Sequence, residues 1–222
     1  MTQSTGTSNP PIEGVEEWIE LVDQALQGLH HALNNRIGSI SALVELYQLG
    51  ELPVGAPRFD NLASDLSGLQ DANRMVRLLP QDSPAGEEPL ILDDVVADVL
   101  AIHRYLHDAR DIQVTIVPTR FVEPVRVERW ALVRVLALLL GDAKRLARLT
   151  GAPVRVAAES DEQWVRVAFR VGQPAVVETP GPARGPYAAQ LAQRFGGIVE
   201  RRAGIAELRL PTLKSRRVAD RR

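Results

Sequence analysis

Residues 128–149 read ERWALVRVLALLLGDAKRLARL and contain the longest nearly continuous apolar run in the chain. Between Trp130 and Gly141 the only charged residue is Arg134. The run is shorter than the ~20 apolar residues that a membrane-spanning helix needs. A helix that is apolar on almost every side lies inside a protein core. We therefore expect residues 128–149 to form a largely buried helix of a folded domain.

The segments on either side of this helix alternate between helical and strand patterns. A helical pattern and a strand precede it, and a pair of strands, a second helix and a final hairpin follow it. These elements occupy residues 90–111, 112–118, 152–171, 185–197 and 198–211. We therefore expect an α/β sandwich with a mixed sheet over residues 90–213.

The N-terminal part of the chain has a different pattern. Apolar residues recur at steps of three and four over residues 15–47, as in the seam of a coiled coil. A segment rich in Gly and Pro follows at 49–58, and a second amphipathic helix starts near Phe59. Two such helices form an antiparallel hairpin, which cannot bury both apolar stripes alone. We expect two copies to form a dimeric four-helix bundle.

These patterns divide the chain into five parts. We expect a disordered N-terminus at 1–13, the helical hairpin at 14–80 and a linker at 81–89. The sandwich occupies 90–213, and a basic tail at 214–222 is expected to be solvated. The fold class is thus α+β, with a helical hairpin followed by an α/β sandwich.

Composition limits the function further. The chain has 222 residues, a net charge of −2 and no cysteine. Disulfides and thiolate metal sites are therefore excluded, and no overall charge attracts nucleic acid or anionic membranes. The first 14 residues lack the apolar segment of a secretory signal. We expect a soluble cytoplasmic protein without membrane insertion or a nucleic-acid partner.

Helix phase separates two adjacent histidines. With Leu29 at 0° and about 100° per residue, the seam averages about 40°. His30 then lies at about 100°, on the flank of the seam, and His31 at about 200°, almost opposite. Asn35, at about 240°, shares the outward face, and Asn34 lies between the two faces at about 140°. We expect a part-buried His30 and an exposed His31, which is either a solvated surface residue or a functional imidazole.

The remaining two histidines are four residues apart. His103 and His107 have a spacing that can bind Zn²⁺ on a helix, but no third ligand is evident nearby. We expect them to be a solvated pair, and we expect no metal site in this chain.

The stretch LHHALNNRIGSISALVELYQLG, residues 29–50, resembles the dimerisation and phosphoacceptor segment of bacterial sensor histidine kinases. That family has a His, usually followed by Asp or Glu, then Leu, a pair such as Asn-Asn, and an apolar run. The resemblance implies that His31 is the phosphoacceptor. It gives Asn35 a supporting role in handling the phosphoryl group, and Asn34 a lesser one.

The similarity extends in order through most of the chain. Residues 90–117 resemble the opening helix and strand of the kinase ATP-binding domain, and 128–147 resemble the helix that carries its Asn box. Residues 164–174 and 185–211 resemble its closing elements. The resemblance therefore implies a Bergerat (GHKL) ATPase fold for the sandwich.

The residues that would bind nucleotide are replaced. Leu138 and Asp142 stand where the family has its two asparagines, although Asp142 taken alone is expected to be a surface or capping acid. Arg170-Val171-Gly172 replaces the Asp-x-Gly that reads adenine, and a guanidinium has no acceptor for the adenine amino group. Four prolines between Gly172 and Tyr187 stand in place of a glycine-rich lid. We expect a degenerate ATPase domain that binds no cofactor.

This combination resembles dimeric histidine phosphotransferases derived from kinases. It implies transfer of a phosphoryl group between receiver-domain aspartates through His31, without ATP, with Mg²⁺ held by the receiver. The expected partners are a second copy and response-regulator receiver domains or a hybrid kinase. The alternative is a non-catalytic pseudo-histidine kinase that acts as a dimeric scaffold. Ala32, where the family has an acid, favours this alternative, and the outward His31–Asn35 pair favours phosphotransfer; an ATP-dependent autokinase is not expected.

Overall fold

A computed structural model describes residues 14–50, 58–78, 86–106, 111–118, 122–172 and 186–219. Several sequence-based expectations lie outside these ranges. They concern the disordered N-terminus at 1–13, residues 81–85 of the linker, His107, and the proline-rich segment at 173–185.

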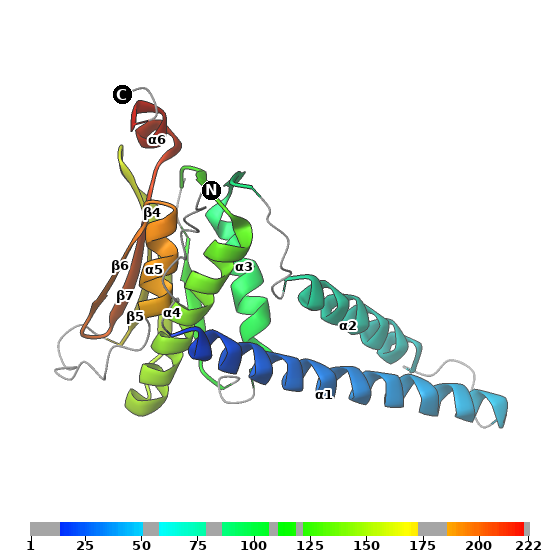
Figure 1. The fold of residues 1–222 in the computed structure, drawn as a ribbon. Helices are drawn as coiled ribbons and strands as arrows, with labels where there is room; N and C mark the ends of the chain where they lie inside the picture. The colour runs from blue at the N-terminus through cyan, green and yellow to red at the C-terminus, as the bar shows by residue number, and fades with distance from the viewer. Residues whose placement is uncertain are drawn as a thin grey trace, which may run out of the picture.

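Two long helices form the expected hairpin. α1 spans Val15–Gln48 and α2 spans Arg58–Leu78. They run side by side and project from the rest of the molecule as an arm (Figure 1). The apolar repeat at steps of three and four therefore predicted the extent of both helices closely.

The rest of the chain is an α/β sandwich. Three helices, α3 (Leu92–His103), α4 (Arg129–Thr150) and α5 (Pro186–Arg194), lie on one side of a sheet (Figure 1). The sheet has the strand order β2-β4-β5-β7-β6, with β2 parallel to β4 and the other neighbours antiparallel. Its strands are β2 (Val114–Val117), β4 (Val154–Ser160), β5 (Trp164–Val171), β6 (Ile198–Arg202) and β7 (Ile205–Pro211). The α+β class, with a helical hairpin and a mixed sheet, is thus confirmed.

Helix α4 is the buried helix that the sequence predicts. Twelve of its side chains are buried, among them Leu132, Leu136, Leu139 and Leu140, each 0% exposed. The strand side chains that face it alternate with outward ones, as in β5, where Val165, Val167, Phe169 and Val171 are buried. The core therefore lies between α4 and the sheet.

The same core extends into the arm. Trp18, Leu21, Ala25 and Leu29 of α1 are buried in one apolar cluster with the sandwich, and α2 adds Ala72 and Met75. No residue of α1 beyond Leu29 is buried. We call residues 15–29 and 72–75 the hairpin base, and residues 30–48 and 58–71 the outer hairpin. The first half of the seam, which the sequence assigns to a bundle, is covered by the sandwich instead.

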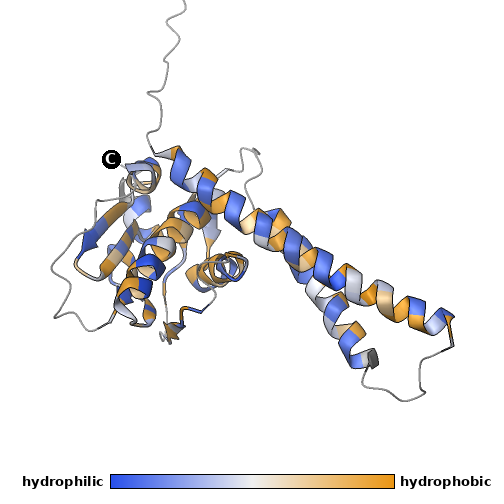
Figure 2. Cartoon of the chain, turned by 90° about the horizontal axis from the view of Figure 1, so that it is seen from below, coloured by the Kyte–Doolittle hydropathy of each residue, from blue (hydrophilic) through white to orange (hydrophobic). Residues whose placement is uncertain are grey.

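The outer hairpin keeps an apolar surface that the chain does not cover. Ile37 is 52% exposed, Val44 49% and Leu66 48%. Figure 2 shows these apolar segments continuing to the end of the arm. The two helices alone therefore leave part of their stripes in solvent, as the sequence predicts for a single hairpin.

Two segments at the domain boundaries are more ordered than expected. Glu88 and Pro89, assigned to the linker, belong to β1 (Glu88–Leu90), which pairs with β3 (Val125–Val127). The tail begins with a short helix, α6 (Leu213–Ala219). Lys214 Nζ lies 2.8 Å from Glu123 Oε1, and Arg216 Nη1 lies 2.6 Å from Glu87 Oε2. The first part of the tail is therefore held by carboxylates and is not fully solvated.

A buried carboxylate joins the hairpin base to the sandwich. Asp98 of α3 is 2% exposed. Its Oδ1 accepts a hydrogen bond from Arg74 Nη2 of α2 at 3.2 Å, and its Oδ2 pairs with Arg129 at the start of α4. One side chain thus connects three helices from both parts of the molecule.

Replacing Asp98 with Ala should lower the free energy of unfolding by about 2 kcal/mol, because two charge-assisted hydrogen bonds are lost from a buried site. Asp94→Ala, on the exposed side of the same helix, should cost no more than about 0.5 kcal/mol. Urea unfolding of both variants measures the difference. Equal losses in the free energy of unfolding for the two variants would show that the buried Asp98 carboxylate adds no more stability than an exposed one.

Candidate functional site

His31 lies where α1 leaves the sandwich. It is two residues beyond Leu29, and its side chain is exposed, as helix phase predicts. His30 is exposed as well, so the expectation that it is part-buried is wrong for a single chain. The reason is its position on the flank of the seam, beyond the part of α1 that the sandwich covers.

The His31 ring is oriented by an amide one turn further along the helix. Asn35 Nδ2 lies 3.4 Å from His31 Nε2. An amide nitrogen only donates, so Nε2 accepts through its lone pair and the ring proton belongs on Nδ1. Nε2 is then the unprotonated, nucleophilic nitrogen. Because the contact is long and exposed, an incoming group displaces the amide at little cost.

The neighbouring pair has a different geometry. Asn34 Nδ2 lies 3.4 Å from His30 Nε2 and 3.5 Å from His30 Nδ1. These nearly equal distances select neither ring nitrogen as the acceptor. The two adjacent imidazoles thus each meet the amide one turn further along α1, His31 through Nε2 alone and His30 through both ring nitrogens.

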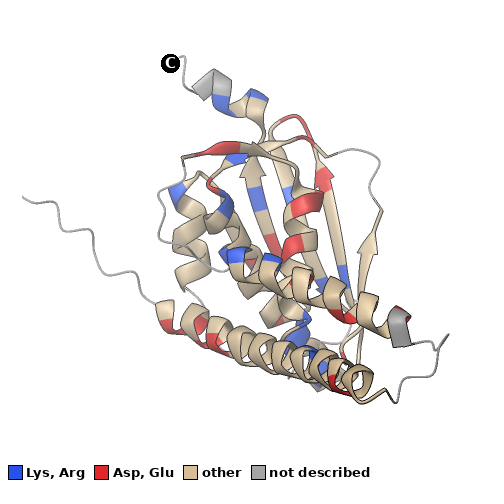
Figure 3. Ribbon diagram, turned by 90° about the vertical axis from the view of Figure 1, so that its right-hand side faces the viewer, with Lys and Arg blue, Asp and Glu red and all other residues tan. Residues whose placement is uncertain are grey.

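The helix face around His31 is small and uncharged. Beyond His31 it continues with Gly38, where a Cβ would meet no atom within 4 Å, and with exposed Ala42. Between Asp23 and Glu45 the sequence has one charged residue, Arg36, and its Nη1 donates to Ser64 O of α2 at 3.3 Å. Figure 3 shows most of the middle of α1 without charge. A partner therefore meets no charged side chain of α1 on this face.

The positions that carry asparagines in the histidine kinases have other roles. Leu138 is 7% exposed and belongs to the core. Asp142, expected to be a surface or capping acid, instead joins α4 to β6: its Oδ2 lies 3.2 Å from Arg201 Nη2, and its Oδ1 pairs with Arg145. At the end of β5, Arg170 points into solvent. Leu138 and Asp142 therefore stabilise the sandwich.

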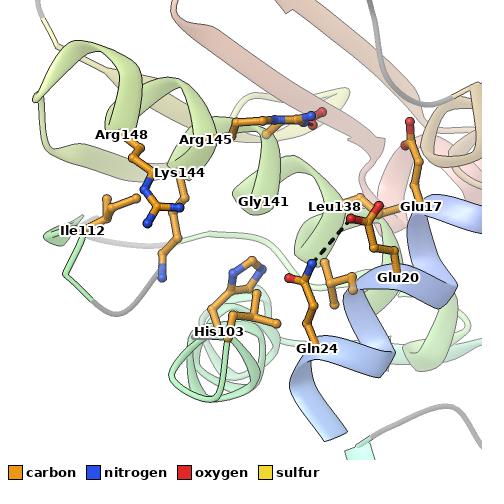
Figure 4. A pocket seen from close by; sticks show the side chains of 13 residues that line it. Glu17, Glu20, Gln24, His103, Ile112, Leu138, Gly141, Lys144, Arg145 and Arg148 are labelled. Carbon is orange, nitrogen blue, oxygen red and sulfur yellow. Dashed lines mark hydrogen bonds and ion pairs between the residues drawn. The ribbon is translucent and has the colours of Figure 1, made fainter. Parts of the chain in front are cut away.

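A cavity of about 250 Å³ lies where α1 crosses the helices of the sandwich (Figure 4). Acidic residues of α1 line one side and basic residues of α4 line the other, with Leu138, Asp142 and His103 between them. The charged lining residues of the two helices are Glu17, Glu20, Asp142, Lys144, Arg145 and Arg148. Charged groups of both signs therefore line the cavity next to positions 138 and 142.

His103 is a core residue and not half of a solvated pair. It is 0% exposed, and its Nε2–H donates to Ala137 O at 2.9 Å. Burial, reinforced by the charge of Lys144, lowers the pKa of His103 to about 3. A signal was present in the sequence, because His103 lies four residues after buried Val99 on the same stripe of α3. In the parts of the chain that the structure describes, no three His or acidic residues are placed to bind a metal ion.

Sequence reasoning missed the contact that fixes the start of α1. The guanidinium carbon of Arg134 lies 5.2 Å from the ring centre of Trp18 and 4.6 Å from that of Trp130. Its Nη1 also donates to Tyr187 Oη at 3.0 Å. The single Arg within an otherwise apolar run was the available signal, since a buried Arg needs partners.

Comparison with solved structures finds similar chains. The histidine kinase ThkA, in complex with the response regulator protein TrrA, is 14% identical with a TM-score of 0.47, over 90% of this chain and 64% of that one. Full-length ShkA in complex with AMPPNP is 14% identical with a TM-score of 0.47, over 84% and 45%. The ATP binding domain of PrrB from Mycobacterium tuberculosis is 21% identical with a TM-score of 0.44, over 58% and 98%. No protein-family model and no curated protein matches the sequence.

These identities lie below 25% and the TM-scores below 0.5. The function proposed below therefore rests on residues of this chain. Among the helices that the structure describes, none combines the length and the apolar character needed to cross a membrane.

The low pKa of His103 makes stability depend on pH. In the folded protein the His103 ring becomes protonated only near pH 3, whereas in the unfolded chain it becomes protonated near pH 6.5. Stability should therefore fall as the pH decreases from about 6.5 towards 3, with a slope of up to about 1.4 kcal/mol per pH unit from this residue. Urea unfolding at several pH values should show a flatter profile for His103→Leu.

His30→Gln serves as the control, because it removes an exposed imidazole instead of a buried one. It should retain the wild-type slope. A wild-type slope in His103→Leu would contradict the assigned burial.

Proposed function

We propose that this chain is a histidine phosphotransferase of two-component signalling. His31 accepts a phosphoryl group from the aspartyl phosphate of one receiver domain and returns it to the aspartate of another. The observation that carries this proposal is the exposed His31 ring, whose Nε2 faces the Asn35 amide at 3.4 Å. Asn34, whose amide contacts the neighbouring His30 ring, has a lesser supporting role.

The transfer needs only an accessible neutral imidazole on this chain. The Nε2 lone pair forms the N–P bond as the P–O bond of the aspartyl phosphate breaks, and the carboxylate leaves with the electron pair. The Nδ1 proton becomes acidic in the resulting imidazolium and passes to water. Asn35, displaced from Nε2, is placed to donate to a phosphoryl oxygen. A Mg²⁺ ion held by the receiver neutralises charge on the phosphoryl oxygens.

Several side chains support transfer without ATP. Asp142 is paired with Arg201 and Arg145 and is not arranged to hold a metal-bound phosphate. Arg170, at the position of the adenine-reading acid, offers no acceptor. Glu17 and Glu20 place two carboxylates on the cavity wall opposite α4. In this proposal the sandwich supports the arm and helps to hold the receiver.

Incubation with receiver domains phosphorylated by radiolabelled acetyl phosphate should transfer label to the wild-type chain. His31→Gln should abolish the transfer, whereas His30→Gln should retain it, because His31 lies on the uncharged outward face of α1 and His30 lies on the flank of the apolar seam. Asn35→Ala should slow transfer about fivefold, corresponding to one hydrogen bond of about 1 kcal/mol. Label on His31→Gln, or none on wild type with any receiver tested, would refute the proposal.

The alternative is a scaffold that binds a kinase or regulator without transfer. Ala32 favours it, because the residue after the imidazole is then a half-buried methyl group and not a carboxylate that could take the ring proton. Under this alternative, His31→Gln leaves both partner binding and the signalling output unchanged. Under phosphotransfer, the output is lost while binding persists.

We also propose that the outer hairpin pairs with a second copy. Ile37, Val44 and Leu66 leave apolar surface in solvent along the arm, and a four-helix bundle is the packing that covers such stripes. The uncharged face with His31 lies away from this stripe and stays open in the dimer.

Sedimentation should therefore show a dimer. Ile37→Glu should shift it to monomer, because the carboxylate would be buried in the bundle. Ser39→Glu, at an exposed position on the opposite face of the same helix, should leave the dimer intact. A dimer that persists in Ile37→Glu would place the interface elsewhere.

A further inference from the structure

Three glycines lie within the two hairpin helices, and their surroundings differ. A Cβ on Gly38 would meet no atom within 4 Å. A Cβ on Gly68 would overlap the Arg36 guanidinium, which is the end of a flexible side chain and can move. A Cβ on Gly28 would lie 1.8 Å from Tyr105 O and 2.8 Å from Tyr105 C. Only Gly28 is held against backbone.

The backbone that Gly28 meets is itself fixed. Tyr105 follows the end of α3, and its N–H donates to Ile102 O at 3.1 Å. Ile102, which accepts this hydrogen bond, and Leu106, the next residue, are buried in the core. Tyr105 O therefore cannot move aside without disturbing the packing of α3.

Gly28 also marks the end of the fixed part of α1. The buried residues of this helix are Trp18, Leu21, Ala25, Gly28 and Leu29. From residue 30 onward α1 contributes no buried residue, and His31 follows three residues after Gly28. The Arg134 contact holds one end of the hairpin base, and the Gly28 contact holds the other.

We propose that Gly28 is a positioning residue for His31: its missing side chain lets α1 cross Tyr105 O at contact distance, which fixes the direction in which the outer hairpin leaves the sandwich. A partner docked on His31 then meets the sandwich in one constant orientation. This inference concerns the geometry of the arm and holds whether or not His31 carries phosphate.

Because the chain has no cysteine, spin labels can be placed at two introduced cysteines. Ser41→Cys on the arm and Thr115→Cys on β2 are both exposed. Double electron–electron resonance, on labelled chains diluted into unlabelled protein, then reports the distance between arm and sandwich within one chain. A second pair, Ser41→Cys with Gln70→Cys, reports whether the hairpin itself is intact.

Wild type and Gly38→Ala should give the same narrow distance between positions 41 and 115. Gly28→Ala must separate Cβ and carbonyl by roughly 1.5 Å to reach van der Waals contact, so the distribution should shift or broaden. The distance between positions 41 and 70 should stay unchanged in all variants. An unchanged 41–115 distribution in folded Gly28→Ala would overturn the proposal.

Trp18→Ala provides a second test that introduces no clash. It removes the other fixed point of the hairpin base and should broaden the same distribution of distances between positions 41 and 115. If Gly28→Ala does not fold, an unchanged Trp18→Ala distribution overturns the proposal.

Transfer from phosphorylated receivers gives a separate readout. Gly28→Ala should raise the KM for the receiver more than it lowers kcat, since the His31 ring and Asn35 remain in place; unchanged kinetics would overturn the positioning role. Absence of transfer in wild type counts against the proposed function alone and leaves the distance test valid.

Discussion

The packing of the first half of α1 against the sandwich is the contact on which the rest of the structure depends. An isolated helical hairpin is only marginally stable, because most helix stability in proteins comes from packing an apolar face. Here Trp18 and Leu21 are buried in the same core as α4, and each such side chain contributes about 1.5–3 kcal/mol. The stack of Arg134 between two tryptophans adds about 1 kcal/mol for each ring. The arm is therefore anchored at one end and free at the other.

This anchoring explains why His31 lies where it does. Up to Leu29 the helix surface belongs to the core, and one residue later it is exposed to solvent. An imidazole at this boundary stands on a fixed backbone yet remains open to another protein. Within the sandwich, Leu138 contributes to the packing and Asp142 to an ion pair between α4 and β6.

Sequence patterns predicted the elements whose signal is periodic. The seam of α1 and the apolar run of α4 define both helices within a residue or two, and alternation predicted β4 and β5. Exposure of His31 followed from phase alone. Contacts between distant segments could not be predicted in this way, because periodicity says which side of a helix is apolar and not what covers it. The covering of the hairpin base by the sandwich is of this kind.

Charged residues were the hardest to place. A lone Arg134, a buried Asp98 and the basic tail all carry polar groups whose partners lie at least 30 residues away or on another element. From composition alone such residues are expected at the surface. Their partners, which are a carboxylate, an aromatic ring or a hydroxyl, come into contact with them only in the folded structure.

The most direct test of a nucleotide-independent carrier is to expose the wild-type chain in parallel to Mg²⁺-ATP and to a phosphorylated receiver, and to map the attached phosphate by mass spectrometry. The account predicts phosphate on His31 from the receiver and none from ATP. Phosphate delivered by ATP, or found on a residue other than His31, would contradict it.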